Sequence, residues 1–186
     1  EVQLGQVGSF AKSLREGWNF KSMPVQSQDL SLGGMMGPCQ SGFAYVPGQG
    51  YDPLEVEEVM MMGEGYWFNC LEAEHTLSGT VPSPPQSEVG TGWNVVGHYG
   101  DAVPVSSITS DPGGIIGTPF FGFDPVLGYQ EADTLRPGQA YWVRVSEGGV
   151  IDYSGAGSDG APAMAAKVAR TGEGPTADAP QLVVRD

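Results

Sequence analysis

A duplicated set of aromatic motifs constrains this chain more than any other feature of its sequence. Three short motifs occur twice in the same order, two of them 75 residues apart and the third 72 residues apart. The pairs are Gly17-Trp18-Asn19 with Gly92-Trp93-Asn94, Gly50-Tyr51-Asp52-Pro53 with Gly122-Phe123-Asp124-Pro125, and Tyr66-Trp67-Phe68 with Tyr141-Trp142-Val143. Ordered self-similarity at a nearly fixed spacing indicates repeated structural units. The sequence therefore predicts two copies of one module.

Each copy is expected to form about four short strands. Glycine (29 residues) and proline (15 residues) are abundant among the 186 residues, which disfavours long helices and suits strands joined by turns. We predict an all-β fold in which the two pseudo-symmetric repeats share one core, as a sandwich or barrel-like unit. The expected strands are 18–25, 43–51, 56–62 and 66–70 in the first repeat, and 93–105, 119–123, 129–135 and 141–145 in the second.

The chain divides by composition into repeats, connectors and a tail. Residues 155–180 are dominated by alanine, glycine and proline, which predicts a flexible linker rather than a packed core. Only residues 9–15 and 163–169 are expected to be helical. The predicted organisation is a lead segment 1–15, a first repeat 16–79, a linker 80–90, a second repeat 91–153, a flexible linker 154–180, and a terminal strand 181–186 that begins a further module or pairs with another strand.

The charge of the chain excludes two classes of partner. Eight basic residues stand against 22 acidic ones, giving a formal net charge of −14. Nucleic-acid binding needs clusters of lysine and arginine to neutralise phosphates, so we expect no nucleic-acid partner. The longest uncharged stretch, between Asp29 and Asp52, is interrupted by glycine, proline and polar residues. We therefore expect no insertion into a membrane.

The motifs of the repeat also resemble a known kind of module. The order Gly-Trp-Asn, Pro-Val (Pro24-Val25 and Pro104-Val105), an aromatic-Asp-Pro corner, and Pro-Gly-x-x-Tyr-Trp-Val (Pro137 to Val143) is similar to β-rich repeats of large secreted and cell-surface proteins of bacteria. The resemblance covers about residues 16–150. It implies an extracellular, non-catalytic building block, and it implies no particular ligand.

The two cysteines, Cys39 and Cys70, leave two alternatives open. They form one disulfide in an oxidising compartment, or they are two buried thiols. Neither cysteine lies in a spacing typical of a metal site.

Aromatic residues supply the candidate binding groups. The tryptophans Trp18, Trp67, Trp93 and Trp142 all fall in the repeated motifs, so we expect them to be structural anchors of the core rather than a sugar-stacking platform. Aromatic residues beside glycine or proline in expected loops are better placed to meet a ligand. These binding candidates are Tyr45, Tyr99, Phe120 and Tyr129.

Aspartates in expected loops raise the question of calcium. Asp52 and Asp124 each precede a proline, where a carboxylate typically accepts backbone N–H groups of the turn. Calcium needs six to eight oxygen ligands, and the sequence lacks an Asp-x-Asp-x-Asp run. A calcium site would require convergence from separate loops of Asp101, Asp111, Asp124 and Asp133.

No paired acid–base motif points to catalysis, so we expect no enzymatic activity and no cofactor other than calcium. The favoured interpretation is an extracellular structural or adhesive module of a bacterial surface or secreted protein, acting through protein–protein contacts or self-assembly. The alternative is a carbohydrate-binding module attached to a secreted enzyme, with polysaccharide as the partner.

Overall fold

The computed structural model describes residues 6–29, 31–55 and 57–155. In this part of the chain the fold is all-β, as predicted, and the strand pairs are antiparallel. One short helix, α1 (Leu32–Met36), and one 3-10 turn, η1 (Val105–Ser107), interrupt the strands. The predicted helix 163–169 and terminal strand 181–186 lie outside the described residues.

The first half of the chain forms a four-stranded sheet and a two-stranded ribbon. The sheet has the strand order β2-β5-β3-β4, and the ribbon joins β1 to β6. The bounds of these strands are β1 (Gln6–Leu14), β2 (Gly17–Ser22), β3 (Cys39–Val46), β4 (Gly50–Pro53), β5 (Gly65–Cys70) and β6 (Ala73–Val81).

The second half forms a sheet with the matching order, β8-β14-β11-β12. Beside it lie a three-stranded sheet, β10-β15-β7, and a short pair, β13-β9. The strand that precedes β8 pairs with the strand that follows β14, just as β1 pairs with β6 around the first sheet. The bounds are β7 (Gln86–Val89), β8 (Gly92–Gly97), β9 (Val103–Pro104), β10 (Thr109–Asp111), β11 (Phe121–Asp124), β12 (Gly128–Glu131), β13 (Thr134–Leu135), β14 (Ala140–Val145) and β15 (Gly149–Asp152).

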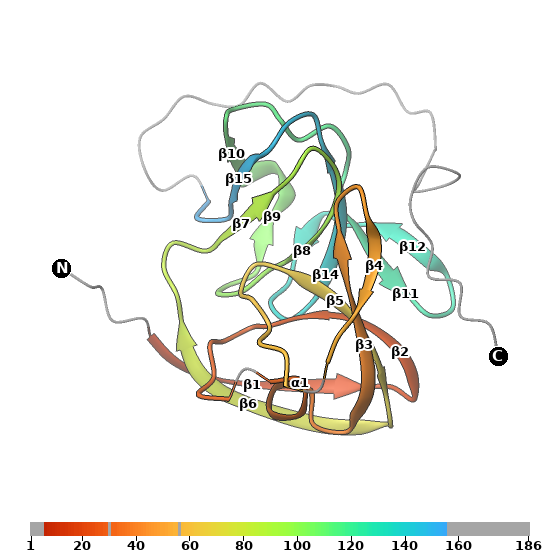
Figure 1. The fold of residues 1–186 in the computed structure, drawn as a ribbon. Coiled ribbons are helices and arrows are strands. Elements are labelled where there is room, and N and C mark those ends of the chain that lie inside the picture. The colour runs from red at the N-terminus through yellow and green to blue at the C-terminus, as the bar shows by residue number, and fades with distance from the viewer. Residues whose placement is uncertain (1–5, 30, 56, 156–186) are drawn as a thin grey trace.

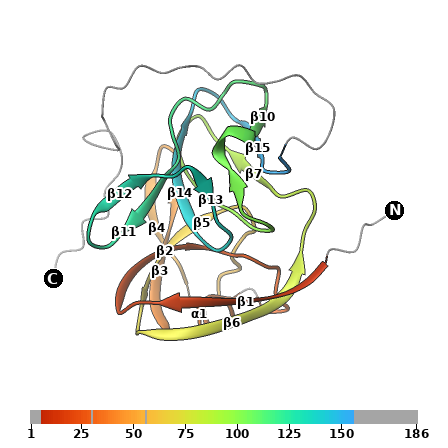
Figure 2. The ribbon, with the colours of Figure 1, turned by 180° about the vertical axis from the view of Figure 1, so that it is seen from behind.

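The elements stack in layers around three apolar clusters. The β1–β6 ribbon lies at one end, β7, β10 and β15 lie at the other, and the two four-stranded sheets lie between them (Figures 1 and 2). Alternation along β5 sends Tyr66 and Phe68 toward the ribbon and Trp67 toward the opposite sheet. Along β14, Tyr141 faces the outer cluster and Trp142 the central one. The central cluster, which combines side chains from both halves, joins the sheets as a sandwich.

The two halves also touch through a reciprocal pair of backbone contacts. Ser22 of β2 donates its N–H to the Gly138 carbonyl at 3.1 Å, and Gly97 of β8 donates its N–H to the Gly63 carbonyl at 2.8 Å. Ser22 and Gly97 are 75 residues apart, and so are Gly63 and Gly138. Each half therefore presents the same position to the other, as the subunits of an isologous dimer do.

Matching asparagines hold the turns that lead into β2 and β8. Asn19 donates from Nδ2 to the carbonyls of Arg15 (2.8 Å) and Gly17 (2.9 Å), and its Oδ1 accepts the Arg15 N–H at 3.0 Å. Asn94 makes the same three bonds with Gly90 and Gly92, at 2.7, 2.9 and 2.9 Å. Gly17 and Gly92 have φ values of 88° and 98°, a region that favours glycine. This geometry explains why Gly-Trp-Asn occurs twice.

Three sequence-based expectations are wrong. Residues 9–15 are not helical, because they lie almost entirely within strand β1. The described residues between 56 and 62 contain no strand. The third motif pair joins unlike positions: Gly50–Pro53 is β4, whereas residues 122–125 span the end of β11 and its turn. The residue equivalent to Phe43, which pairs with Trp67, is Phe121, which pairs with Trp142.

Candidate functional site

The repeated tryptophans lie in or beside the central cluster. Trp67 stacks on Phe20 with ring centroids 4.6 Å apart and meets Phe123 of the other half edge-on at 4.8 Å. Trp142 meets Tyr45 of the first half at 4.7 Å. Trp67 and Trp142 are buried, whereas Trp18 and Trp93 are half-buried at the edge of the same cluster. Aromatic rings therefore hold the two sheets together.

The aromatic residues expected to meet a ligand do not form one exposed platform. Tyr99 is 5% exposed and Phe120 is 1% exposed, so packing covers both rings. Tyr45 lies in β3 and Tyr129 in β12, not in loops, and both are half-buried against the central cluster. Burial raises the pKa of the Tyr129 hydroxyl, which accepts the Trp142 indole N–H at 3.3 Å.

Where the halves meet, the surface carries two hollows at corresponding positions. The first, of about 270 Å³, is lined by residues that include Tyr45, Pro47, Glu64, Glu88, Asn94 and Val95. The second, of about 210 Å³, is lined by residues that include Arg15, Asn19, Phe20, Lys21, Phe123, Pro125 and Gln139. Residues 75 or 78 positions apart occupy the same places in both: Asn19 with Asn94, Phe20 with Val95, Gln139 with Glu64, Phe123 with Tyr45, and Pro125 with Pro47.

The two hollows carry opposite charge. Glu64 and Glu88 line the first, which we call the acidic hollow. Arg15 and Lys21 line the second, the basic hollow, together with a single carboxylate, Asp124. Their sizes are below the roughly 300–1,000 Å³ of pockets for drug-sized ligands, so each hollow accommodates a side chain or a small group.

Lysines gather at the basic hollow in spite of the acidic composition of the chain. Lys21 donates from Nζ to Gln139 Oε1 at 3.2 Å, and burial followed by the charge of Arg15 lowers its pKa. Burial, with a smaller contribution from the charge of Lys21, lowers the pKa of Lys12 to about 7. Lys12 itself lies inside the β1–β6 ribbon. The basic hollow is thus a place where positive charge is held at a cost and an anionic partner would be stabilised.

An apolar hairpin tip projects beside the basic hollow. The β11–β12 turn carries Val126 and Leu127, whose side chains are 85% and 70% exposed. Asp124 Oδ1 accepts the N–H groups of Val126 (2.8 Å) and Leu127 (2.9 Å), and these bonds hold the pKa of Asp124 below its usual value. The equivalent β3–β4 turn carries Gly48 and Gln49 at its tip. The hairpin therefore folds without exposed apolar residues, and Val126 and Leu127 are not needed for the turn itself.

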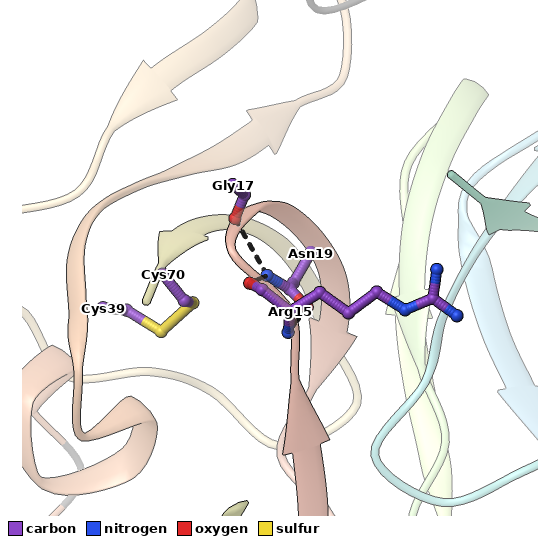
Figure 3. The surroundings of a disulfide bond; sticks show 5 residues. All are labelled: Arg15, Gly17, Asn19, Cys39 and Cys70. Atoms are coloured by element: carbon purple, nitrogen blue, oxygen red, sulfur yellow. Dashed lines mark hydrogen bonds between the residues drawn. A yellow bond between two sulfur atoms is a disulfide. The ribbon is translucent and has the colours of Figure 1, made fainter. Parts of the chain in front are cut away.

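Cys39 and Cys70 form a disulfide, which settles the two alternatives left by the sequence. The two cysteines are register partners in β3 and β5. Cys70 also pairs with Gly17, so the disulfide lies at the end of the sheet near the Asn19 turn (Figure 3). In that view the Arg15 side chain extends away from the disulfide. A buried disulfide is consistent with an oxidising, extracellular compartment.

The aspartates proposed as calcium ligands lie on separate elements. Asp101 follows β8, Asp111 ends β10, Asp124 ends β11, and Asp133 follows β12. Within residues 6–29, 31–55 and 57–155, no three His, Cys, Asp or Glu side chains are grouped to hold a metal ion. Asp124 instead caps its own turn, the role expected from its Asp-Pro context. Calcium binding remains a prediction from composition.

His98 has a structural environment. Its Nε2 lies 2.6 Å from the Asp101 backbone carbonyl, and because a carbonyl only accepts, Nε2 is the protonated nitrogen. The ring meets Tyr153 edge-on at 5.1 Å, and burial lowers its pKa. His98 is 1% exposed, so a substrate has no access to it.

Comparison with known proteins leaves the geometry to speak for itself. No protein-family model, curated protein or solved structure matches the chain. Among the described residues, no helix has the length and apolar character to cross a membrane.

The sequence analysis missed both the hairpin tip and the pair of hollows. Two adjacent apolar residues in a turn, Val126 and Leu127, were a readable signal for the tip. The hollows had no such signal, because their matching residues recur at two offsets, 75 and 78, and the 72-residue match of the third motif conceals the second offset.

Proposed function

We propose that this chain is a non-catalytic, extracellular structural or adhesive module of a bacterial surface or secreted protein, and that it acts through protein–protein contacts. The observation that carries the proposal is the β11–β12 tip. Val126 and Leu127 are strongly exposed, and the matching turn of the first half has no counterpart to them. Exposed apolar groups on a rigid turn lose little conformational entropy on docking, which favours a binding role.

The distribution of aromatic residues supports a protein partner over a polysaccharide. Sugar-binding modules need aromatic faces that a pyranose ring can cover. Here Phe120 and Tyr99 are covered, and Tyr45 and Tyr129 pack against Trp142. The disulfide is consistent with the extracellular location in the proposal.

A binding comparison tests this function. The immobilised chain is probed with a panel of purified proteins, which includes the chain itself, and with a panel of polysaccharides. The test variant is Val126→Gln with Leu127→Gln, and the control is Leu71→Gln, because Leu71 is also an exposed apolar residue (53%) but lies after β5. We expect the tip variant to weaken protein binding at least about tenfold and the control to retain it.

Two results would overturn the proposal. One is protein binding that is unchanged in the tip variant. The other is binding to polysaccharide that survives in the tip variant and is lost in Tyr129→Ala, which would make the chain a carbohydrate-binding module.

A further inference from the structure

The two hollows differ in charge although they occupy equivalent positions in the two halves. Gln139 of the basic hollow corresponds to Glu64 of the acidic hollow, and Arg15 corresponds to Gly90. Both halves keep the same strand order and the same asparagine turns. The fold therefore tolerates either set of residues, and the opposite charges are not required for folding.

The apolar surface of the two hollows is also unequal. Ala44, Val89 and Val95 line the acidic hollow together with Tyr45 and Pro47. The basic hollow has mainly polar walls, and the exposed Val126–Leu127 tip projects beside it. One region of the molecule thus combines an apolar protrusion with positive charge, and the equivalent region combines an apolar depression with negative charge.

We propose that a second copy of this chain is the partner, and that copies associate head to tail. In this contact the Val126–Leu127 tip of one copy enters the acidic hollow of the next, and Arg15 and Lys21 of the first copy face Glu64 and Glu88 of the second. The proposal rests on the proposed function, since it names the protein that the tip contacts. The contact is heterologous, so it continues from copy to copy as an open chain or a ring.

Charge complementarity is the argument for this occupant. The chain carries a formal charge of −14, so two copies repel each other in most orientations. The head-to-tail orientation brings the basic hollow, a rare positive region, against a negative one. Oppositely charged faces select register and speed encounter, and the small size of the hollows predicts a weak contact that salt reduces.

Sedimentation velocity of the full chain tests the inference. We expect the average mass to rise with protein concentration at about 0.05 M salt and to fall back toward the monomer at about 0.5 M salt. A chain that stays monomeric at every concentration overturns the inference. If the tip variant still loses binding to another protein of the panel, the proposed function survives that result.

Two variants, each with one altered face, make the test specific. Arg15→Glu with Leu127→Gln alters the basic face, and Glu88→Lys alters the acidic face. All three residues are exposed, so folding is expected to be retained, and near-ultraviolet circular dichroism checks it. Each variant alone is expected to self-associate at least about tenfold more weakly, and Glu72→Lys, away from both hollows, is the matched control.

Mixing the two variants is the decisive arm. The intact basic face of Glu88→Lys can bind the intact acidic face of the other variant, so the equimolar mixture should form dimers and stop there. A mixture that remains monomeric overturns the head-to-tail contact. Assembly that persists in both variants but disappears on deletion of residues 171–186 also overturns it, because the contact would then lie in the tail.

Discussion

Ser22 and Gly97 occupy the same position in the two halves of the chain, and each donates its backbone N–H to a glycine carbonyl of the other half, at 3.1 and 2.8 Å. A Cβ added to Gly97 would strike the Glu64 carbonyl and the Ser22 side chain. A Cβ added to Gly65 would lie 2.6 Å from the side chains of Ala140 and Val95. The two sheets therefore meet through positions where a glycine is required for close approach.

Gly97→Ala tests this close approach. The added methyl group has no space, so we expect a loss of about 1–3 kcal/mol in the free energy of unfolding, measured by urea titration. Gly113→Ala is the control, because the nearest atom to its added Cβ is 3.9 Å away. Equal stability of Gly97→Ala and wild type would show that the halves do not meet as described.

The asparagine turns make a paired prediction. Asn19→Ala and Asn94→Ala each remove three hydrogen bonds of a buried side chain, so each should cost roughly 2–3 kcal/mol. Asn19→Asp should cost more, because it replaces a donor that faces two carbonyls with an acceptor. Thermal unfolding of the three variants checks the order, and an Asp variant as stable as wild type would contradict it.

The disulfide should stabilise the first half. It closes a loop between residues 31 positions apart, for which the loss of chain entropy in the unfolded state predicts about 3–4 kcal/mol. We expect Cys39→Ser with Cys70→Ser to unfold at a lower temperature than the wild type. Reductant should lower the melting temperature of the wild type and leave the double variant unchanged. An effect of reductant on both proteins would point to another cause.

Lys12 makes stability depend on pH. Its folded pKa of about 7 lies below the usual 10.5, so between these values the unfolded chain binds more protons than the folded chain. Stability should therefore rise with pH from about 7 toward 10, and below pH 7 the penalty should be fully present. Lys12→Met should be more stable than wild type at pH 7, with a difference that shrinks toward pH 10. Arg144→Gln controls for loss of a surface charge, and a difference that does not vary with pH would contradict this account.

The sequence predicted the strands in which large and small side chains alternate. Along β5 and β14 the aromatic residues fall on defined faces, so their strand character was readable from period-2 spacing. Strand β1 was not readable in this way, because Lys12 occupies an inward position between Phe10 and Leu14. That polar residue hid the alternation, and only pairing with β6 fixes the segment as a strand.

The candidate sites depended more on tertiary structure. The Asp-Pro motifs match in letters, but Asp52 lies in β4 and Asp124 at the β11–β12 turn. Short identical motifs carry no information about register, which here is fixed by pairing with Trp67 and Trp142. The binding candidates Tyr99 and Phe120 are buried because glycine and proline neighbours mark turns without determining which side chains face the solvent.

The central claim is that the two halves share one aromatic core and therefore present the tip and the hollows on a single rigid body. Fluorine NMR of the chain labelled with 5-fluorotryptophan, followed through urea unfolding, tests it most directly, since Trp18 and Trp67 report on one half and Trp93 and Trp142 on the other. Single Trp→Phe variants assign the four signals. We predict that all four native signals disappear at one urea concentration. Loss of the Trp18 and Trp67 signals at one concentration and of the Trp93 and Trp142 signals at another would contradict the shared core.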